Sequence, residues 1–267
     1  MQDDASLAAV LHARSASAEE IKVLVHDAEE ATLLALLENP NFDEPNVIQL
    51  LERFDLSSKI LSAVSDSGKW TSSEQVRLRL ARHPRIPRRI ALALLRQLFL
   101  FDLVSVSLQP SAPADVRRAA EGIILARIPH LPVGEKLTLA RRGPSRIAGA
   151  VLAEGHPQAI KLALSNGFLT ESQVLKVLAK ADVPERVVTA IAQHAKWSCQ
   201  YNVRIGLLRN AHTPAPIVLA ILPDLTIGDL KEIAKHEPLA PRLKKYIHQE
   251  LERRLAGESD NLDESKQ

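Results

Sequence analysis

The chain repeats one local pattern, in which apolar residues recur at positions i, i+3 and i+4 and so fall on one side of an α-helix. Runs in which apolar and polar residues alternate, as in a half-buried strand, are scarce. The helical pattern is clearest in residues 71–81, 87–98, 113–128, 170–178, 184–191, 214–221 and 241–255. We therefore predict an all-α protein.

Prolines divide these windows into short helices. The chain has 16 prolines, and several of them, such as Pro87 and Pro184, stand directly before an amphipathic window. Proline suits the first helical position, where its missing N–H costs nothing, and breaks a helix interior. We expect roughly 15–17 helices of about 8–14 residues. Ser-Ala-Glu-Glu at residues 17–20 predicts a capping box, and Asn39 and Asn166 fit helix C-termini with left-handed backbone.

The chain also contains a long internal repeat. Residues 69–103 align with residues 196–230 without a gap at an offset of 127, and 14 of the 35 aligned pairs are identical. The same offset matches further pairs upstream. Shared composition alone would scatter such identities over many offsets, so we interpret the match as an internal duplication. We expect a first copy over residues 1–127 and a second over residues 128–256, within one continuous structural domain.

Shorter units recur inside each copy. A helix ends, a short loop follows, and a proline opens the next helix. The sequence number rises by 26 from Pro87 to Pro113, by 30 from Pro184 to Pro214 and by 27 from Pro214 to Pro241. Two helices in such a unit cannot bury their apolar faces alone, and stacking of successive units buries them. The pattern therefore predicts an α-solenoid, a superhelix of stacked short antiparallel helix pairs.

This cadence of helix, proline-containing loop and helix resembles the variant leucine-rich repeat and HEAT-like α-solenoids of bacteria. The blocks that begin at Lys69-Trp70 and Lys196-Trp197, each followed by Val-Arg, resemble an uncharacterised bacterial family built from such repeats. The resemblance covers most of residues 31–256 and rests on packing motifs, so it implies a fold and a binding role. Some variant leucine-rich repeat proteins hold an iron–sulfur cluster on N-terminal cysteines. This chain has a single cysteine, so the resemblance implies no such cofactor here.

Composition narrows the chemistry further. Leucine (41) and alanine (35) are abundant and aromatic residues make up 3%, which favours helix over sheet. The single Cys199 excludes a disulfide scaffold and a multi-cysteine metal site, and it has no evident histidine partner for catalysis. The nine histidines show no metal-binding spacing, and the chain contains no phosphate-binding or hydrolase motif. We expect no enzymatic activity, no metal and no cofactor.

Charge is unevenly distributed, although the net charge is only +2. Residues 1–69 carry −8, residues 70–256 carry +13 and residues 257–267 carry −3. We expect an acidic N-terminal head, a basic body and a disordered acidic tail. Three interpretations stay open. The charges serve solubility, or the basic body forms a concave groove for an acidic partner or nucleic acid, or the head or tail screens that groove.

The sequence also bears on location. The N-terminus has two early acids and no basic segment before its apolar residues, unlike a secretory signal. No stretch approaches the roughly 18 consecutive apolar residues of a transmembrane helix. Together with the free cysteine, these features predict a cytoplasmic protein that does not enter a membrane. We expect a monomer or a weak dimer.

Six residues are candidates for contacting a partner: Arg82, Arg85, Arg89, Arg209, Trp70 and Trp197. The first three belong to a dense basic cluster suited to phosphate contact. Arg82 and its counterpart Arg209 also fit the last turn of a helix, where a cation meets the negative end of the dipole. The two tryptophans are either platforms for a base or peptide, or packing residues between units.

Two charged pairs recur at the same offset. Arg77 and Asp102 of the first copy correspond to Arg204 and Asp229 of the second. Each arginine lies mid-helix, and each aspartate lies in the helices that follow. We predict that the arginine pairs with the aspartate within each copy and aligns adjacent layers, as charged ladders do in HEAT-like stacks.

These features favour a non-enzymatic scaffold that binds another protein, an acidic one by its charge, on the concave solenoid surface. The alternative is a HEAT-like solenoid that binds nucleic acid in a basic groove, with base-modifying activity as an extension. No motif matches the HEAT-like DNA glycosylases residue by residue. Phosphate binding weakens steeply as salt rises and needs lysines and arginines clustered on the concave side, which distinguishes the two.

Overall fold

The computed structural model describes residues 2–27, 29–235 and 241–264. Within these residues the chain forms twenty α-helices and two short 3₁₀ helices, and no β-strand. The all-α prediction is confirmed. Helices are more numerous than the roughly 15–17 expected, partly because two helices have only four residues and carry no amphipathic period of their own.

The chain divides into two compact units, Met1–Arg127 and Ile128–Gln267. The first contains α1 (Gln2–Ser15), α2 (Ala18–Asp27), α3 (Glu30–Leu36), α4 (Glu44–Leu50), α5 (Ser58–Asp66), α6 (Gly68–Thr71), α7 (Glu74–Arg82), α8 (Arg88–Leu95), α9 (Leu100–Leu108) and α10 (Ala114–Arg127). The second contains η1 (Ile128–His130), α11 (Val133–Arg142), α12 (Ser145–Glu154), α13 (Pro157–Leu164), α14 (Glu171–Leu178), α15 (Glu185–Gln193), α16 (Ala195–Ser198), α17 (Tyr201–Arg209), α18 (Ala215–Ile221), η2 (Leu222–Asp224), α19 (Ile227–Ala234) and α20 (Pro241–Glu264).

Helix boundaries in the second unit follow those of the first at the offset found in the sequence. The pairs α2 and α12, α5 and α15, α6 and α16, and α7 and α17 all begin and end at this offset of 127. Helices α10 and α20 also begin at the same offset. These helix boundaries therefore agree with the offset seen in the sequence.

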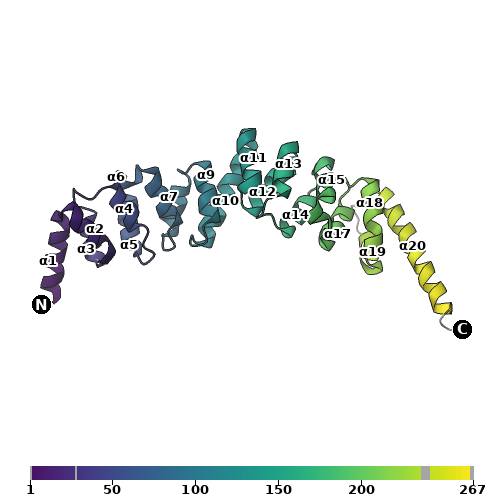
Figure 1. Ribbon diagram of the computed structural model, residues 1–267, viewed down its shortest axis with the longest axis horizontal. Helices are drawn as coiled ribbons and strands as arrows, with labels where there is room; N and C mark the ends of the chain where they lie inside the picture. The colour runs from purple at the N-terminus through teal and green to yellow at the C-terminus, as the bar shows by residue number, and fades with distance from the viewer. Residues whose placement is uncertain (1, 28, 236–240, 265–267) are drawn as a thin grey trace. The chain divides into compact units, whose positions relative to one another are not determined.

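Within each unit the helices pack side by side in rows (Figure 1). In the first unit α2, α4, α7 and α9 pack in succession, as do α1, α3 and α5, while α8 packs against α10. In the second unit the corresponding series are α12, α14, α17 and α19, then α11, α13 and α15, with α18 against α20. We call α2–α4–α7–α9 and α12–α14–α17–α19 the groove rows, because the grooves described below open on them.

The amphipathic positions form the core of each unit. Val76 and Leu80 of α7, and Val203 and Leu207 of α17, are fully buried. Burial of one such side chain contributes about 1.5–3 kcal/mol. Helices this short are marginal when isolated, so packing between helices supplies their stability.

Helix starts show how the local sequence acts. The backbone N–H and the hydroxyl of Ser17 both donate to Glu20 Oε2, at 2.8 and 2.7 Å, and these bonds lower the pKa of Glu20. The bond from the Ser17 N–H is the glutamate half of the predicted capping box. Pro241 is the first residue of α20, as expected, whereas Pro87 and Pro184 lie one residue earlier, at the N-cap. The N-cap N–H also lies outside the helical hydrogen bonds, so a proline there costs equally little.

The C-terminal segment differs from its prediction. Helix α20 continues to Glu264, so residues 257–264 are helical rather than disordered, and residues 265–267 lie outside the described part of the chain. Extending a helix that has already formed costs far less than starting one. None of the helices in the described residues is both long enough and apolar enough to span a membrane.

Candidate binding grooves

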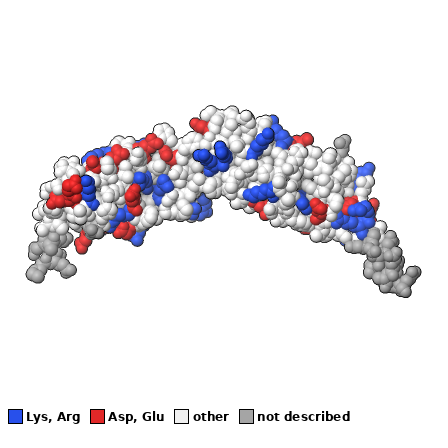
Figure 2. All heavy atoms as spheres, in the orientation of Figure 1, with Lys and Arg blue, Asp and Glu red and all other residues white. Residues whose placement is uncertain are grey.

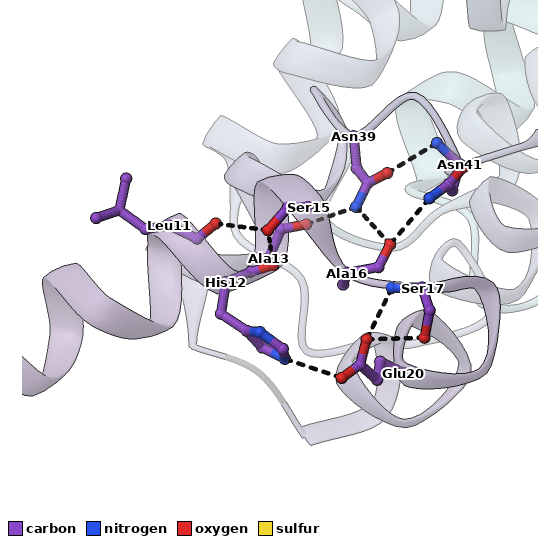
Figure 3. Close-up of polar contacts among 9 residues, drawn as sticks. All are labelled: Leu11, His12, Ala13, Ser15, Ala16, Ser17, Glu20, Asn39 and Asn41. Atoms are coloured by element: carbon purple, nitrogen blue, oxygen red, sulfur yellow. Dashed lines mark hydrogen bonds and ion pairs between the residues drawn. The ribbon is translucent and has the colours of Figure 1, made fainter.

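Two buried asparagines join neighbouring helices in the same way in the two units. Asn39 Nδ2 donates to the carbonyl oxygens of Ala13 (2.8 Å) and Ala16 (3.0 Å), and its Oδ1 accepts from the N–H of Asn41 (2.7 Å) (Figure 3). Asn166, its counterpart in the second unit, makes the three corresponding bonds at 2.8, 3.0 and 2.7 Å. No described non-glycine residue has a positive φ, so the predicted left-handed cap is wrong. The side chains instead satisfy carbonyls at the ends of α1 and α11.

The recurring arginines hold local turns. Arg77 donates to two backbone carbonyls at the junction of α6 and α7, and Arg204 donates to one at the junction of α16 and α17. Arg204 also forms an ion pair with Asp224 at 2.9 Å. Neither guanidinium forms an ion pair with Asp102 or Asp229 within the described residues. The predicted Arg77–Asp102 and Arg204–Asp229 pairs are therefore wrong. Arg204 pairs with Asp224 instead, whereas Arg77 Nε and Asp102 Oδ2 are buried without a hydrogen-bond partner among the described residues.

The two aspartates link α7 to α9 and α17 to α19 through other partners. Thr226 Oγ1 and Tyr201 Oη both donate to Asp229, and these two hydrogen bonds lower the pKa of its carboxyl. In the first unit Glu74 stands in the position of Tyr201. Its carboxyl shares a hydrogen bond with Asp102, which raises the pKa of Glu74. The same two helices are thus joined by different chemistry in each unit.

Both tryptophans are packing residues. Trp70 and Trp197 are 3% and 2% exposed, and the ammonium groups of Lys69 and Lys196 lie 3.9 and 4.1 Å from their ring centroids. Trp197 Nε1 also donates to the carbonyl of Leu164 at 2.9 Å. Because the rings are buried, neither can stack on a base or a peptide at the surface. The prediction that they contact a partner is wrong, and the packing alternative holds.

The basic cluster after α7 is on the surface, and its members have different partners. Arg82 Nη2 donates to Gln109 Oε1 at 2.6 Å, and Arg85 Nη1 donates to the carbonyl of Asp55 at 2.8 Å. Arg89 is exposed and makes no hydrogen bond or ion pair with any residue that the structure describes. None of these three guanidinium groups forms an ion pair with a carboxylate there, so their charge is available to an anionic ligand.

The loops that follow α7 and α17 are each held by a buried side chain. His83 Nδ1 accepts from the N–H of Arg85 at 3.1 Å, and its Nε2 lies 2.7 Å from the carbonyl of Arg53. Asn210 accepts from the N–H of His212 at 2.8 Å and donates to the last carbonyl of α14 at 2.6 Å. Burial lowers the pKa of His83, which favours a neutral ring with Nε2–H as donor to Arg53.

A groove of about 480 Å³ opens in the first unit between the end of α4, α7 and the loop after α9. Leu78 and Phe54 supply apolar surface, and the Phe54 side chain at the rim is 63% exposed. Arg79, which forms an ion pair with Glu52 at 2.8 Å, and Arg82 supply its charged surface. We call this the first groove.

A second groove, of about 640 Å³, lies at the corresponding place between α14, α17 and α19. Its lining includes eight residues that each correspond, at the offset of 127, to a lining residue of the first groove: Leu178, Ala179, Ala181, Asn202, Ile205, Gly206, Arg209 and Asn210. Ala181 and Gly206 stand in place of Phe54 and Arg79. Arg209 remains and forms an ion pair with Glu232 at 2.6 Å.

The sequence pointed to Arg82 and Arg209, which line the two grooves, but it did not point to Phe54 or His83. Phe54 is an apolar residue in a loop, outside any amphipathic window, and this is the one sequence feature that could have identified it as a groove residue. His83 aligns with Asn210 and has no metal-binding spacing, so its structural role shows only in its hydrogen bonds.

Within the described residues, no group of three histidine, cysteine, aspartate or glutamate side chains could hold a metal ion. Comparison with protein-family models, with curated proteins and with solved structures finds no match. The two grooves are therefore interpreted from their own geometry and chemistry.

Proposed function

We propose that the chain is an internally duplicated, HEAT-like α-solenoid that acts as a non-enzymatic scaffold and binds a protein segment along its groove rows. One observation carries the proposal. A groove opens at corresponding positions of both units, over the same pair of helices, and eight lining positions of one groove correspond to eight of the other.

The duplication is supported by contacts that composition cannot produce. The three hydrogen bonds of Asn39 recur on Asn166, and the lysine–tryptophan contact recurs as well. Arg127 also donates to the carbonyl of Leu98, and Arg254 donates to that of Leu225, so both members of this contact recur at the same offset. Such agreement between backbone partners favours two copies of one ancestral unit.

Binding rather than catalysis is supported by the surface of the grooves. Both are open troughs with an apolar floor, formed in the second groove by Leu175, Leu178 and Ile205, and with charged side chains at the rim. Grooves of this kind suit an extended or helical segment, whose apolar side chains enter while its backbone stays accessible. A cytoplasmic setting and a monomeric or weakly dimeric chain belong to the same proposal.

The proposal is tested by photo-crosslinking in the native cell. A photoreactive amino acid replaces Gln75 or Asn202, which line the first and second groove, or replaces Ser58 or Glu185, exposed residues of α5 and α15 outside the groove rows. We expect discrete protein adducts from Gln75 and Asn202 and none from Ser58 and Glu185. Equal labelling at all four positions, or none at either groove, would contradict binding at the grooves.

A further inference from the structure

The two grooves share a framework but differ in the charge beside them. Residues 83–89 read His-Pro-Arg-Ile-Pro-Arg-Arg, whereas residues 210–216 read Asn-Ala-His-Thr-Pro-Ala-Pro. Arg85, Arg88 and Arg89 of the first unit thus have no cationic counterpart in the second. Arg88 lies 3.3 Å from Asp115, whereas the other two arginines form no ion pair with a carboxylate in the described residues.

The charge on the groove walls differs in the same sense. In the first groove, Glu52 neutralises Arg79 while Arg82 contacts the neutral Gln109. The lining of the second groove balances two cations, Lys180 and Arg209, against two acids, Asp229 and Glu232, and Arg209 forms an ion pair with Glu232. An uncompensated positive charge therefore lies on the wall of the first groove, close in sequence to the arginines of residues 83–89.

Apolar surface lies next to this charge. The exposed Phe54 ring stands at the rim, with its centroid 6.5 Å from that of His83. Leu51 and Leu78 line the groove beneath it. A ligand that contacts the arginines with carboxylates can therefore place a bulky apolar side chain against Phe54 at the same time.

We propose that the first groove is a site for an acidic peptide segment that carries a bulky apolar anchor. Arg82 lines this groove, Arg85 is held at Asp55 next to Phe54, and the exposed Arg89 follows in the sequence. The second groove binds segments without this acidic preference. The inference rests on the proposed scaffold function and assigns the ligand chemistry of one of its two grooves. Guanidinium groups form bidentate, charge-assisted hydrogen bonds with carboxylates, which is the chemistry that would recognise the acidic residues.

A nucleic acid fits this surface less well. Glu52, Asp55 and Asp115 stand among the arginines and would repel a continuous phosphate backbone. Figure 2 shows basic and acidic atoms side by side over the first unit, with no unbroken basic track on the face in view. A peptide can space its carboxylates to avoid these acids, and its anchor uses the apolar rim that a sugar–phosphate chain would leave empty.

Two variants exchange the charge between the units using residues found at corresponding positions, except that glutamine takes the place of Arg89, whose counterpart is Pro216. The loss variant is Arg85→His, Arg88→Ala and Arg89→Gln, and the gain variant is His212→Arg, Ala215→Arg and Pro216→Arg. Arg85→His introduces the residue that the second unit has at this position. There the Nε2 of His212 lies 2.9 Å from the carbonyl of Ala181 in the preceding loop, so histidine can replace the arginine as a donor to that loop. Arg82→Gln has a matched control in Arg209→Gln.

The full chain and each variant are panned against a displayed library of random dodecapeptides. For the parent chain we expect enrichment of glutamate and aspartate beside phenylalanine, tryptophan or leucine. An enriched acidic peptide should bind the loss variant and Arg82→Gln at least about tenfold more weakly, which corresponds to about 1.4 kcal/mol. Arg209→Gln should leave its affinity unchanged, and the gain variant should bind a second copy.

The outcomes separate the two proposals. If no peptide is enriched on the parent chain, the scaffold function itself fails. If peptides are enriched without acidic residues, or if acidic peptides bind the loss variant as tightly as the parent, the acidic site is overturned and the scaffold stands. Tighter binding of a single-stranded oligouridylate dodecamer than of any enriched peptide would assign the arginines to nucleic acid instead. Far-ultraviolet circular dichroism of each variant reports whether it is folded.

Discussion

Removal of the buried asparagines should destabilise the two units to the same extent. Asn39 and Asn166 are 1% and 2% exposed, and each makes three hydrogen bonds of 2.7–3.0 Å to backbone groups. Figure 3 shows those of Asn39. Alanine leaves two carbonyls and one N–H without these partners. A net loss of about 1 kcal/mol for each bond predicts a cost of about 3 kcal/mol for Asn39→Ala and for Asn166→Ala.

Aspartate at the same positions should cost more. One carboxylate oxygen then replaces the Nδ2 donor and faces the carbonyls of Ala13 and Ala16. The exchange turns two attractive contacts into repulsive ones without changing the side-chain volume. Asn39→Asp is therefore the variant that distinguishes hydrogen bonding from packing, because a packing role predicts a smaller loss than for alanine.

The two tryptophans provide a separate readout for each unit. In a Trp197→Phe background fluorescence reports on Trp70 and the first unit, and in a Trp70→Phe background it reports on Trp197 and the second unit. With an m-value of about 2 kcal/mol per molar urea, a loss of about 3 kcal/mol lowers the urea midpoint by about 1.5 M. Asn202→Ala, at an exposed position, should change the midpoint little. A loss below about 0.5 kcal/mol for both alanine variants would refute the reasoning.

Three further predictions concern single residues. Burial lowers the pKa of His83 from 6.5, so the neutral ring stabilises the fold above pH 6.5 and this stabilisation is lost as pH falls toward the lower folded-state pKa. The urea midpoint should therefore fall between neutral and mildly acidic pH in the parent chain, and this fall should be absent in His83→Asn. Gly155 has φ +78°, so Gly155→Ala should cost about 1–2 kcal/mol in thermal unfolding, while Gly167→Ala, with open space around it, should be nearly neutral. Glu74 has a raised pKa because it shares a hydrogen bond with Asp102, so the protonated carboxyl stabilises the fold below about pH 4.5 and this stabilisation is lost as pH rises through the raised pKa. Glu74→Gln should therefore raise the melting temperature at pH 7 more than at pH 4.

The helices, and the offset of 127 residues between the two units, could be predicted because burial imposes a period on the sequence. Val76 and Leu80 are buried on one side of α7, and Val203 and Leu207 repeat them on α17. The partners of Arg77 could not be predicted in the same way. A guanidinium on a long side chain reaches both the carbonyls one turn before its helix and the acids of the next helix, and the sequence does not rank these alternatives.

The grooves were out of reach of sequence analysis for a different reason. Their volume depends on side chains that are small, such as Ala181 and Gly206, and on the spacing between α14 and α17. A small residue in a helical window looks like any other neutral position. The role of Gly206 shows only once the neighbouring helix is in place: it lets the side chains of α14 pack closely against α17, since a Cβ at Gly206 would lie 3.0 Å from Leu175 Cδ2.

The contrast between framework and rim indicates where the two units can diverge. A change at Asn39 removes three hydrogen bonds to backbone groups, so such a position tolerates only a replacement that restores the bonds, as histidine and asparagine do at 83 and 210. Exposed positions such as Arg89 and Pro216 carry no comparable cost. Charge beside a groove can therefore change while the groove itself persists, which is what the proposal of two grooves with different ligand preferences requires.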